Sequence, residues 1–240
     1  MAKQPTPGAA VSVIIPVYNR VDRVCLTIES VLAQEDVRAE VIVVDDGSTD
    51  GSFDAVSEIA REVPRVRVEG FGENRGVSAA RNRGMEIATS EFLTFIDSDD
   101  RMPPRRLAEQ LDALAEEPDG LVVGLQELDI ADEIDLPVTI AATLDVDPSD
   151  RFYIMSMFGR RSTFDRVGWF LEEFPISQDL DYLIRARDMG VPVVRVPRIW
   201  VLRGIYGDNL VNDDVALRRE LLQVYRAHHR RVGDLASDEQ

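Results

Sequence analysis

The stretch VSVIIPVYNRVDRVCLTIESVLAQEDVRAEVIVVDD, residues 11–46, decides the fold. It begins with an almost continuously apolar run over 11–17 and ends with a second one over 40–45, and such runs are typical of strands buried on both faces of a parallel sheet. Between them, apolar residues recur at helical spacing, at Val21, Val24, Ile28, Val31 and Leu32. We therefore expect a strand, a crossover helix and a parallel strand, which indicates an α/β fold.

The same alternation continues along the chain. Further strands are expected over 65–69, 91–96, 121–125 and 191–196, and regular structure is expected to return over 153–158. Helices are expected over 52–62 and 78–88, after Pro103 and Pro104, from Gln178, and over about 213–231. The ending GDLASDEQ is expected to fray. The predicted fold class is a single α/β domain with a mostly parallel central sheet flanked by helices.

Residues 126–150 interrupt this pattern because they are acidic and have no clear period. Between Arg106 and Arg151 lie thirteen Asp and Glu and no Lys or Arg, whereas basic residues gather after Arg151. Long irregular segments inside a domain are commonly functional surface loops. We expect a loop or lid near 126–150 that faces the substrate; a plain solvated acidic face is the alternative.

Composition excludes several classes of protein. The formal charge of −17 disfavours nucleic acid or an anionic membrane as the main partner. No apolar run reaches the roughly 18 residues that span a bilayer, so we expect no transmembrane segment, and the N-terminus MAKQPTPGAA lacks the pattern of a signal peptide. The single cysteine, Cys25, excludes an internal disulfide framework. A cytoplasmic protein is expected.

Polar, turn-forming residues follow each of the first four expected strands. If these strands are parallel neighbours, the groups converge at one edge of the sheet, where ligands of open α/β sheets bind. The groups are Pro16, Tyr18 and Asn19; Asp45, Asp46, Gly47 and Ser48; Gly72, Glu73, Asn74, Arg75 and Gly76; and Asp97, Ser98, Asp99 and Asp100.

Asp97, Asp99 and Asp100 place three carboxylates within four residues at the end of a buried strand. Their mutual repulsion is costly without a cation, and Mn²⁺ or Mg²⁺ prefers oxygen ligands that it shares with substrate phosphates. An exposed acidic turn that caps the following helix is the alternative.

Two other patterns carry less information. Gly70, Gly72 and Gly76 resemble a dinucleotide fingerprint, but the spacing is one residue too long and the motif follows the third strand instead of the first. His228 and His229 are expected on a solvated helix face.

Taken together, four segments resemble the nucleotide-binding half of family 2 glycosyltransferases with the GT-A (Rossmann-like) fold: VSVIIPVYNR, VVDDGSTDGS, ENRGVSAARNRGMEIA and FLTFIDSDDRMPP. GRRSTFDRVGWF and SQDLDYLIRARDMG resemble the acceptor half. The resemblance implies a disordered arm over 1–10 and a GT-A domain over 11–210. Its nucleotide-binding half spans 11–103 and its acceptor half 104–210, and a C-terminal helix and tail follow over 211–240.

The resemblance also implies roles for matching positions. Pro16, Tyr18, Asp46 and Asn74 would hold the base and ribose of a uridine nucleotide, and Arg81 would approach the diphosphate. Asp97 would contact the ribose or a metal-bound water, and Asp99 would be the direct ligand of Mn²⁺ or Mg²⁺.

Asp179 matches the family's general base, so the implied reaction moves a sugar from a nucleoside-diphosphate sugar, for which a UDP-sugar is expected, with inversion. Asp181 is expected to have a structural role instead, paired with Arg185 at i+4, with Leu180, Leu183 and Ile184 on the buried side.

Two features depart from the family pattern. Gln178 stands where Glu usually precedes the base, and Gly204 and Tyr206 replace Arg and a metal-binding His. A sugar-nucleotide-binding protein with little or no turnover is therefore the alternative, followed by an unrelated nucleotide enzyme. The acceptor stays open between a glycan, a lipid-linked sugar, a small metabolite and a peptide.

Overall fold

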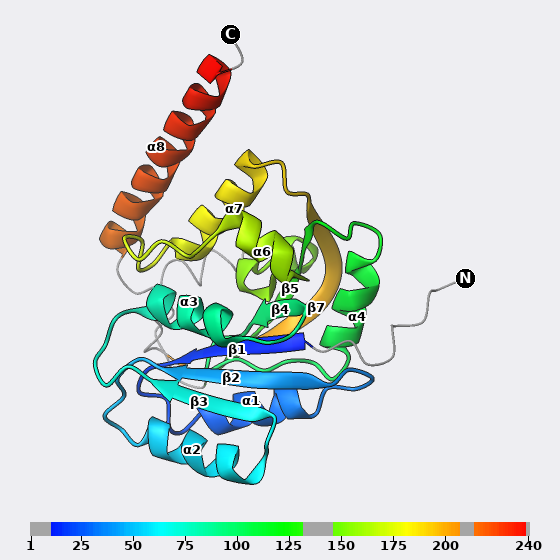
Figure 1. Ribbon diagram of the computed structural model, residues 1–240, viewed down its shortest axis with the longest axis vertical. Helices are drawn as coiled ribbons and strands as arrows, with labels where there is room; N and C mark the ends of the chain where they lie inside the picture. The colour runs from blue at the N-terminus through cyan, green and yellow to red at the C-terminus, as the bar shows by residue number, and fades with distance from the viewer. Residues whose placement is uncertain (1–10, 132–145, 207–213, 239–240) are drawn as a thin grey trace.

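A seven-stranded sheet forms the centre of the described structure, a computed structural model that covers residues 11–131, 146–206 and 214–238 (Figure 1). The strands are β1 (Val11–Val17), β2 (Ala39–Asp45), β3 (Val66–Gly70), β4 (Phe92–Phe95), β5 (Leu121–Ile130), β6 (Phe158–Arg160) and β7 (Val193–Ile205). Their order is β3-β2-β1-β4-β6-β5-β7. Only β6 pairs antiparallel with its neighbours, which confirms the mostly parallel sheet for the described residues.

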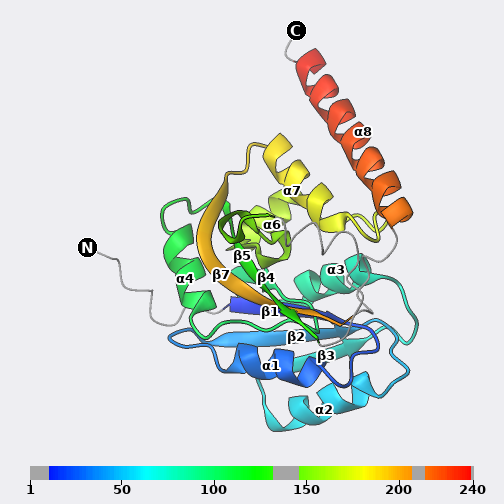
Figure 2. The ribbon, with the colours of Figure 1, turned by 180° about the vertical axis from the view of Figure 1, so that it is seen from behind.

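Helices cover both faces of this sheet (Figures 1 and 2). They are α1 (Val24–Leu32), α2 (Ser52–Glu62), α3 (Val77–Ile87), α4 (Arg106–Leu114), α6 (Arg161–Val167), α7 (Gln178–Asp188) and α8 (Asp214–Asp238). Two clusters of buried residues show that α1, α2 and α4 pack on one face, and α3, α6 and α7 on the other. The helix α8 extends away from the sheet beyond α7.

The alternation of side chains along β1 explains why both faces are covered. Val13 and Ile15 belong to the cluster under α1 and α2, whereas Ile14 belongs to the cluster under α3. All three are fully buried. Because successive side chains of a strand point to opposite faces, a continuously apolar strand needs helices on both sides.

The helix α3 lies close to the sheet because it presents small residues to it. Ala80 is fully buried, and a Cβ at Gly84 would overlap the side chain of Ile14. This close approach carries Arg81, the next residue after Ala80, to the end of β4.

The expected loop over 126–150 was wrong for its first part, because β5 continues as a strand to Ile130. Its partner β7 is correspondingly long and extends well beyond the expected 191–196. Gly124 of β5 makes this pairing possible, since a Cβ there would overlap the indole of Trp200 on β7, which is fully buried. Pairing with β7, which resumes after register shifts around Leu125, and this aromatic contact override the irregular acidic sequence. Residues 132–145 lie outside the described part.

The ordered segment expected over 153–158 is mainly a 3₁₀ turn over Ile154–Ser156, and the strand β6 begins at Phe158. Met155 of that turn and Met157 after it are buried by packing without belonging to a strand. The expected fraying after 232 is contradicted, because α8 continues to Asp238.

The expected arm over 1–10 lies outside the described residues. Among the helices that are described, none is long and apolar enough to cross a bilayer.

Candidate active site

Loops that follow the first two strands are joined at one edge of the sheet. The backbone N–H of Asn19 donates to Ser48 Oγ across 2.9 Å, and Thr49 N–H donates to Asn19 Oδ1 across 2.8 Å. Asn19 takes a positive φ of 51°, a conformation that Asn tolerates better than most residues. The convergence expected from parallel strand ends is therefore present.

The four residues expected at the base and ribose of a nucleotide all lie at this edge. Pro16 is buried in β1 beside Val44 of β2, whereas Tyr18 follows β1 with 46% of its surface exposed. Asn74 is exposed in the loop between β3 and α3, and Asp46 is almost fully buried at the end of β2.

Asp46 holds the loop that carries Asn74. Its two carboxylate oxygens accept hydrogen bonds from Arg75 N–H at 2.7 Å and Gly76 N–H at 2.9 Å. Burial raises the pKa of Asp46, and the two N–H donors act against that effect. Asp46 therefore also has a structural role, which sequence spacing did not reveal because it does not show which backbone groups a carboxylate contacts.

Arg81 and Asp97 form an ion pair between α3 and the end of β4, in which the arginine is buried and the aspartate is partly exposed. Arg81 Nη2 donates to Asp97 Oδ1 across 2.7 Å, and only 2% of the Arg81 side chain is exposed. Its Nε and Nη1 have no hydrogen-bond partner among the described residues. Leaving such donors unpaired costs free energy, so this guanidinium has capacity for an anionic ligand.

Tyr153 is a functional candidate that the sequence did not reveal, because no motif marks the irregular turn that it precedes. Its hydroxyl donates to Asp97 Oδ2 across 2.9 Å. Burial alone would raise the pKa of Asp97, but Arg81 and Tyr153 together hold it below its ordinary value. Asp97 is therefore kept as a carboxylate.

Asp99 and Asp100 sit in a more strongly acidic environment. Burial and the neighbouring Asp97 raise the pKa of Asp99, although Arg20 Nε lies 3.4 Å from its Oδ2. Asp100 is 2% exposed, and its pKa is raised well above the ordinary value by burial and by Asp97 and Asp99. Asp100 Oδ1 accepts from Gly204 N–H at 3.0 Å, so this carboxyl joins β4 to β7.

The residues at the end of β4 suit a hard divalent cation that completes its coordination with phosphate and water. Burial and the nearby charge of Asp97 disfavour the ionised form of Asp99, and a bound cation would offset this electrostatic cost. Within the described residues, no group of three or more His, Cys, Asp or Glu forms a metal cage. Mg²⁺ commonly uses one or two carboxylates plus substrate phosphates, so Asp99 and Asp97 fit a shared site.

Asp179 lies at the first turn of α7 and its electrostatic neighbours are Arg81 and Asp97. Its Oδ1 accepts from Leu180 N–H across 2.8 Å. Burial raises its pKa, Arg81 lowers it, and Asp97 raises it further. The fold therefore brings the expected base, from the second half of the chain, to the ion pair of the first half.

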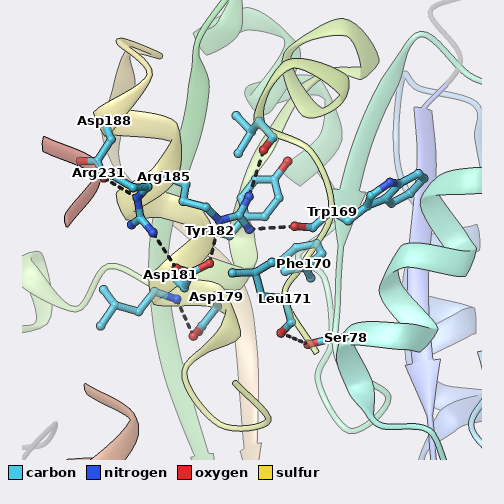
Figure 3. A network of polar contacts seen from close by, with 12 residues as sticks. Ser78, Trp169, Phe170, Leu171, Asp179, Asp181, Tyr182, Arg185, Asp188 and Arg231 are labelled. Carbon is cyan, nitrogen blue, oxygen red and sulfur yellow. Dashed lines mark hydrogen bonds and ion pairs between the residues drawn. The ribbon is translucent and has the colours of Figure 1, made fainter. Parts of the chain in front are cut away.

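Asp181 points into a different network, which Figure 3 shows between α7 and α8. It is fully buried, and its Oδ2 accepts from Arg185 Nε at 2.7 Å, as the spacing predicted. Arg231 of α8 lies 3.7 Å from Asp181 Oδ1 and donates to Asp188 at 3.0 Å. His228 also contacts Asp188, at 2.8 Å, so only its neighbour His229 is on the exposed face that was expected for both.

The buried side of α7 differs from the expected one. Leu180, Leu183 and Ile184 are only partly buried. The buried residues are Gln178, Asp181, Tyr182 and Ala186. Ionic and aromatic contacts with α6, the 168–171 segment and α8 decide this orientation, which hydrophobicity alone does not predict.

Tyr206 and Gly204 are linked sterically next to Asp99. A Cβ at Gly204 would overlap the ring of Tyr206 and come within 2.5 Å of the Asp99 carbonyl oxygen. The Arg23 guanidinium lies 4.1 Å from the centroid of the same ring. The two departures from the family pattern thus form one packed unit, in which the aromatic ring excludes a side chain at 204.

Comparison with known proteins identifies the family of this chain. Residues 12–167 match the family model described as glycosyl transferase family 2. Over 106 residues the chain is 40% identical to the putative teichuronic acid biosynthesis glycosyltransferase TuaG of Bacillus subtilis. This aligned region covers 44% of this chain and 42% of TuaG. The regions matched in TuaG and in YibD of Escherichia coli cover less than half of those proteins, 42% and 27% of their respective lengths.

Solved structures show the same fold. The mannosyltransferase PcManGT of Pyrobaculum calidifontis, in complex with GDP-Man and Mn²⁺, superposes with a TM-score of 0.73 at 23% identity, over 95% of this chain and 66% of that one. TarS 1–349 of S. aureus, in complex with UDP, superposes with a TM-score of 0.67 at 21% identity, over 92% of this chain and 65% of that one. The architecture is that of the GT-A glycosyltransferases. Together with the family match over most of the chain, this shows that the protein belongs to glycosyl transferase family 2.

Proposed function

We propose that this chain transfers a sugar from a UDP-sugar to a hydroxyl group of an acceptor, with a divalent cation and with inversion at the anomeric carbon. One observation carries the proposal. Arg81 is a buried arginine whose Nε and Nη1 have no hydrogen-bond partner among the described residues, and it pairs with the carboxylate of Asp97 and lowers the pKa of Asp179 by its charge. A candidate anion-binding group is thus electrostatically coupled to one candidate metal-side carboxylate and to one candidate base.

The donor would lie along the edge where β1, β2 and α3 meet. Pro16, Tyr18, Asp46 and Asn74 would surround the base and ribose, and Arg81 would direct its free Nε and Nη1 at the diphosphate. UDP is preferred here because the four residues match the uridine-binding pattern, and TarS is solved with UDP. PcManGT holds GDP-Man, so a guanosine donor is the competing choice.

Asp99, with Asp97 beside it, would hold Mn²⁺ or Mg²⁺ against the diphosphate. Such an ion, when bound, stabilises as a Lewis acid the negative charge that develops on the leaving diphosphate. Arg81 would contribute to the same task through charge-assisted hydrogen bonds, which are roughly twice as strong as neutral ones.

Asp179 would act as the general base. The acceptor oxygen forms a bond to the anomeric carbon while its proton passes to the Asp179 carboxylate, and the bond from that carbon to the diphosphate oxygen breaks with its electron pair. In-line attack of this kind inverts the anomeric centre. A positioned base contributes about 10² to 10⁴ in rate.

A sugar-nucleotide-binding protein with little turnover is the second candidate. It is favoured by Gln178, whose buried Oε1 has no partner among the described residues, and by the Tyr206 ring packed beside Asp99. In the family that this chain resembles, the position of Gln178 usually holds Glu and that of Tyr206 a metal-binding His. Gln178 therefore supplies no acidic group there, and Tyr206 supplies no imidazole ligand.

Hydrolysis of a panel of UDP- and GDP-sugars, with and without Mn²⁺, tests both candidates. Wild-type protein should release UDP only with the ion, and Asp99→Asn should abolish release. Calorimetry on the same samples separates the candidates: UDP binding without turnover of any donor would support the binding protein. Equal UDP affinity with and without Mn²⁺ would remove the metal from the proposal.

A further inference from the structure

The helix α8 presents a long solvent-facing side that combines apolar and basic residues. Val215, Leu222 and Tyr225 are 78%, 57% and 59% exposed, which is unusual for large apolar side chains on one helix. Leu221 and Val232 are also exposed. Four arginines share this exposure: Arg218, Arg219, Arg226 and Arg230.

These residues occupy one continuous half of the helix. At about 100° per residue, the exposed positions between 215 and 233 fall within an arc of roughly 180°. The buried and partly buried positions, which include Glu220, Val224 and Arg231, fill the other half. We call the exposed half the α8 outer face, composed of Val215, Arg218, Arg219, Leu221, Leu222, Tyr225, Arg226, His229, Arg230 and Val232.

The outer face reverses the charge of the protein locally. The chain carries −17 overall, yet no acidic side chain lies on the outer face among the α8 residues whose exposure is described, 215–233. The one acidic residue in that range, Glu220, is buried against the segment before α7. The α8 ion pairs found within the described residues belong to the inner side, where His228 and Arg231 meet Asp188 and Asp181.

A hollow of about 750 Å³ adjoins this face, between α8 and the loop before α7. Tyr225, Arg226 and Arg230 line it on the helix side, and Glu173 and Phe174 on the other. Two arginines one turn apart at an open hollow next to an aromatic ring suit an anionic headgroup whose chain continues along the apolar residues. Glu173 opposes the charge there, so the arginines outside the hollow must supply the remaining attraction.

We propose that the α8 outer face docks on an anionic phospholipid bilayer. Helices that lie in a membrane surface combine an apolar strip with flanking Lys or Arg, and this face has that composition. A second copy of the chain fits less well, because packing two outer faces together would set arginine against arginine with no acid between them. The overall negative charge would repel such a bilayer, so attachment depends on this face alone.

Co-sedimentation with vesicles tests the proposal. The full chain is mixed, without nucleotide or divalent cation, with vesicles of phosphatidylcholine alone or with phosphatidylglycerol added. Binding should appear only with phosphatidylglycerol and weaken as salt rises, since surface charge attraction is screened. Each arginine near an anionic surface strengthens binding about fivefold, so Arg226→Gln with Arg230→Gln should weaken it roughly 30-fold.

Matched variants make the result specific. Arg166→Gln with Arg198→Gln removes the same charge from two exposed arginines off α8 and should leave vesicle binding unchanged. Leu222→Ser with Tyr225→Ser should weaken binding about tenfold or more at unchanged charge. Thermal unfolding confirms that each variant is folded.

Three results would overturn the proposal: no binding to phosphatidylglycerol vesicles, equal losses in the α8 and control arginine pairs, or a concentration-dependent dimer that the Leu222 and Tyr225 changes dissolve. None of these readouts uses the donor or transfer reaction.

Discussion

Arg81 Nη2 on α3 donates a 2.7 Å hydrogen bond to Asp97 Oδ1 at the end of β4. The pair joins α3 to the end of β4, and its two residues are 16 positions apart in the sequence. The other two nitrogens of this guanidinium, Nε and Nη1, have no hydrogen-bond partner among the described residues.

Replacing Arg81 should therefore weaken donor binding more than it weakens the fold. Arg81→Lys keeps the charge but loses the planar fork, and we expect UDP affinity in calorimetry to fall at least about tenfold, the loss typical of a charge-assisted hydrogen bond. Arg83→Lys is the matched control on the same helix, since Arg83 pairs with Glu69 and Glu86 at the surface. Similar UDP affinities for both variants would remove Arg81 from the donor site.

Asp179 and Asp181 should separate catalysis from stability. Asp179→Asn is expected to retain UDP-sugar binding and lose at least about 10² in single-turnover transfer. Asp181→Asn leaves Arg185 and Arg231 facing a neutral group in a buried position, and breaking a buried pair costs about 3–5 kcal/mol. Thermal unfolding and transfer at saturating donor test both. A near-normal transfer rate for Asp179→Asn would refute its role as base.

The pH dependence follows from the raised pKa of Asp179. Burial is the main cause, and Arg81 acts against it. Because a base works deprotonated, transfer should decline as pH falls through a value above the ordinary 3.8. For stability the sign is opposite: a raised folded-state pKa favours the protonated fold, so stability is lost as pH rises from 3.8 through the raised value. Asp179→Asn should remove this loss, which unfolding measured across the same pH range would show.

Asp46→Ala should affect both stability and binding. It deletes the acceptor for Arg75 and Gly76 N–H, and each buried group left unpaired costs about 1–3 kcal/mol. We expect a lower unfolding temperature together with weaker UDP binding, because the loop that carries Asn74 loses its anchor. Asp46→Asn keeps one acceptor oxygen and should be intermediate in both measurements. An unchanged unfolding temperature in Asp46→Ala would show that the loop between β3 and α3 keeps its conformation without these hydrogen bonds.

Glu220 is expected to position the candidate base from α8. Its Oε2 accepts from Ile176 N–H at 2.9 Å and Ser177 N–H at 2.8 Å, directly before the helix that carries Asp179. Glu220→Ala should lower the turnover number about tenfold, with donor KM unchanged, and Glu220→Gln should restore part of it because an acceptor oxygen returns. A change in KM alone, or equal defects in both variants, would contradict positioning.

Much of the first half of the site was predictable from local sequence. The strands before Tyr18, Asp46 and Asp97 are nearly continuous apolar runs, so their ends were visible as points where polar residues begin. Parallel neighbours bring such ends together, which is why the convergence held.

The second half was harder to predict because its elements lack a clean period. The long β7 has exposed, charged positions such as Arg195 and Arg198, and its length is set by pairing with β5. Tyr153 reaches Asp97 from an irregular turn, so no repeat in the sequence marks it.

By itself, the sequence determined the α/β class, the succession of the first strands along the chain and the candidate metal-binding carboxylates, since periodicity and strand ends are encoded among neighbours along the chain. Only the tertiary structure decided that Asp46 anchors the Asn74 loop, that Gly204 must yield space to Tyr206, and that α8 holds the start of α7. The physical reason is distance along the chain: Glu220 and Ser177 are 43 residues apart, and their hydrogen bond exists only once the packing of both helices has brought them together.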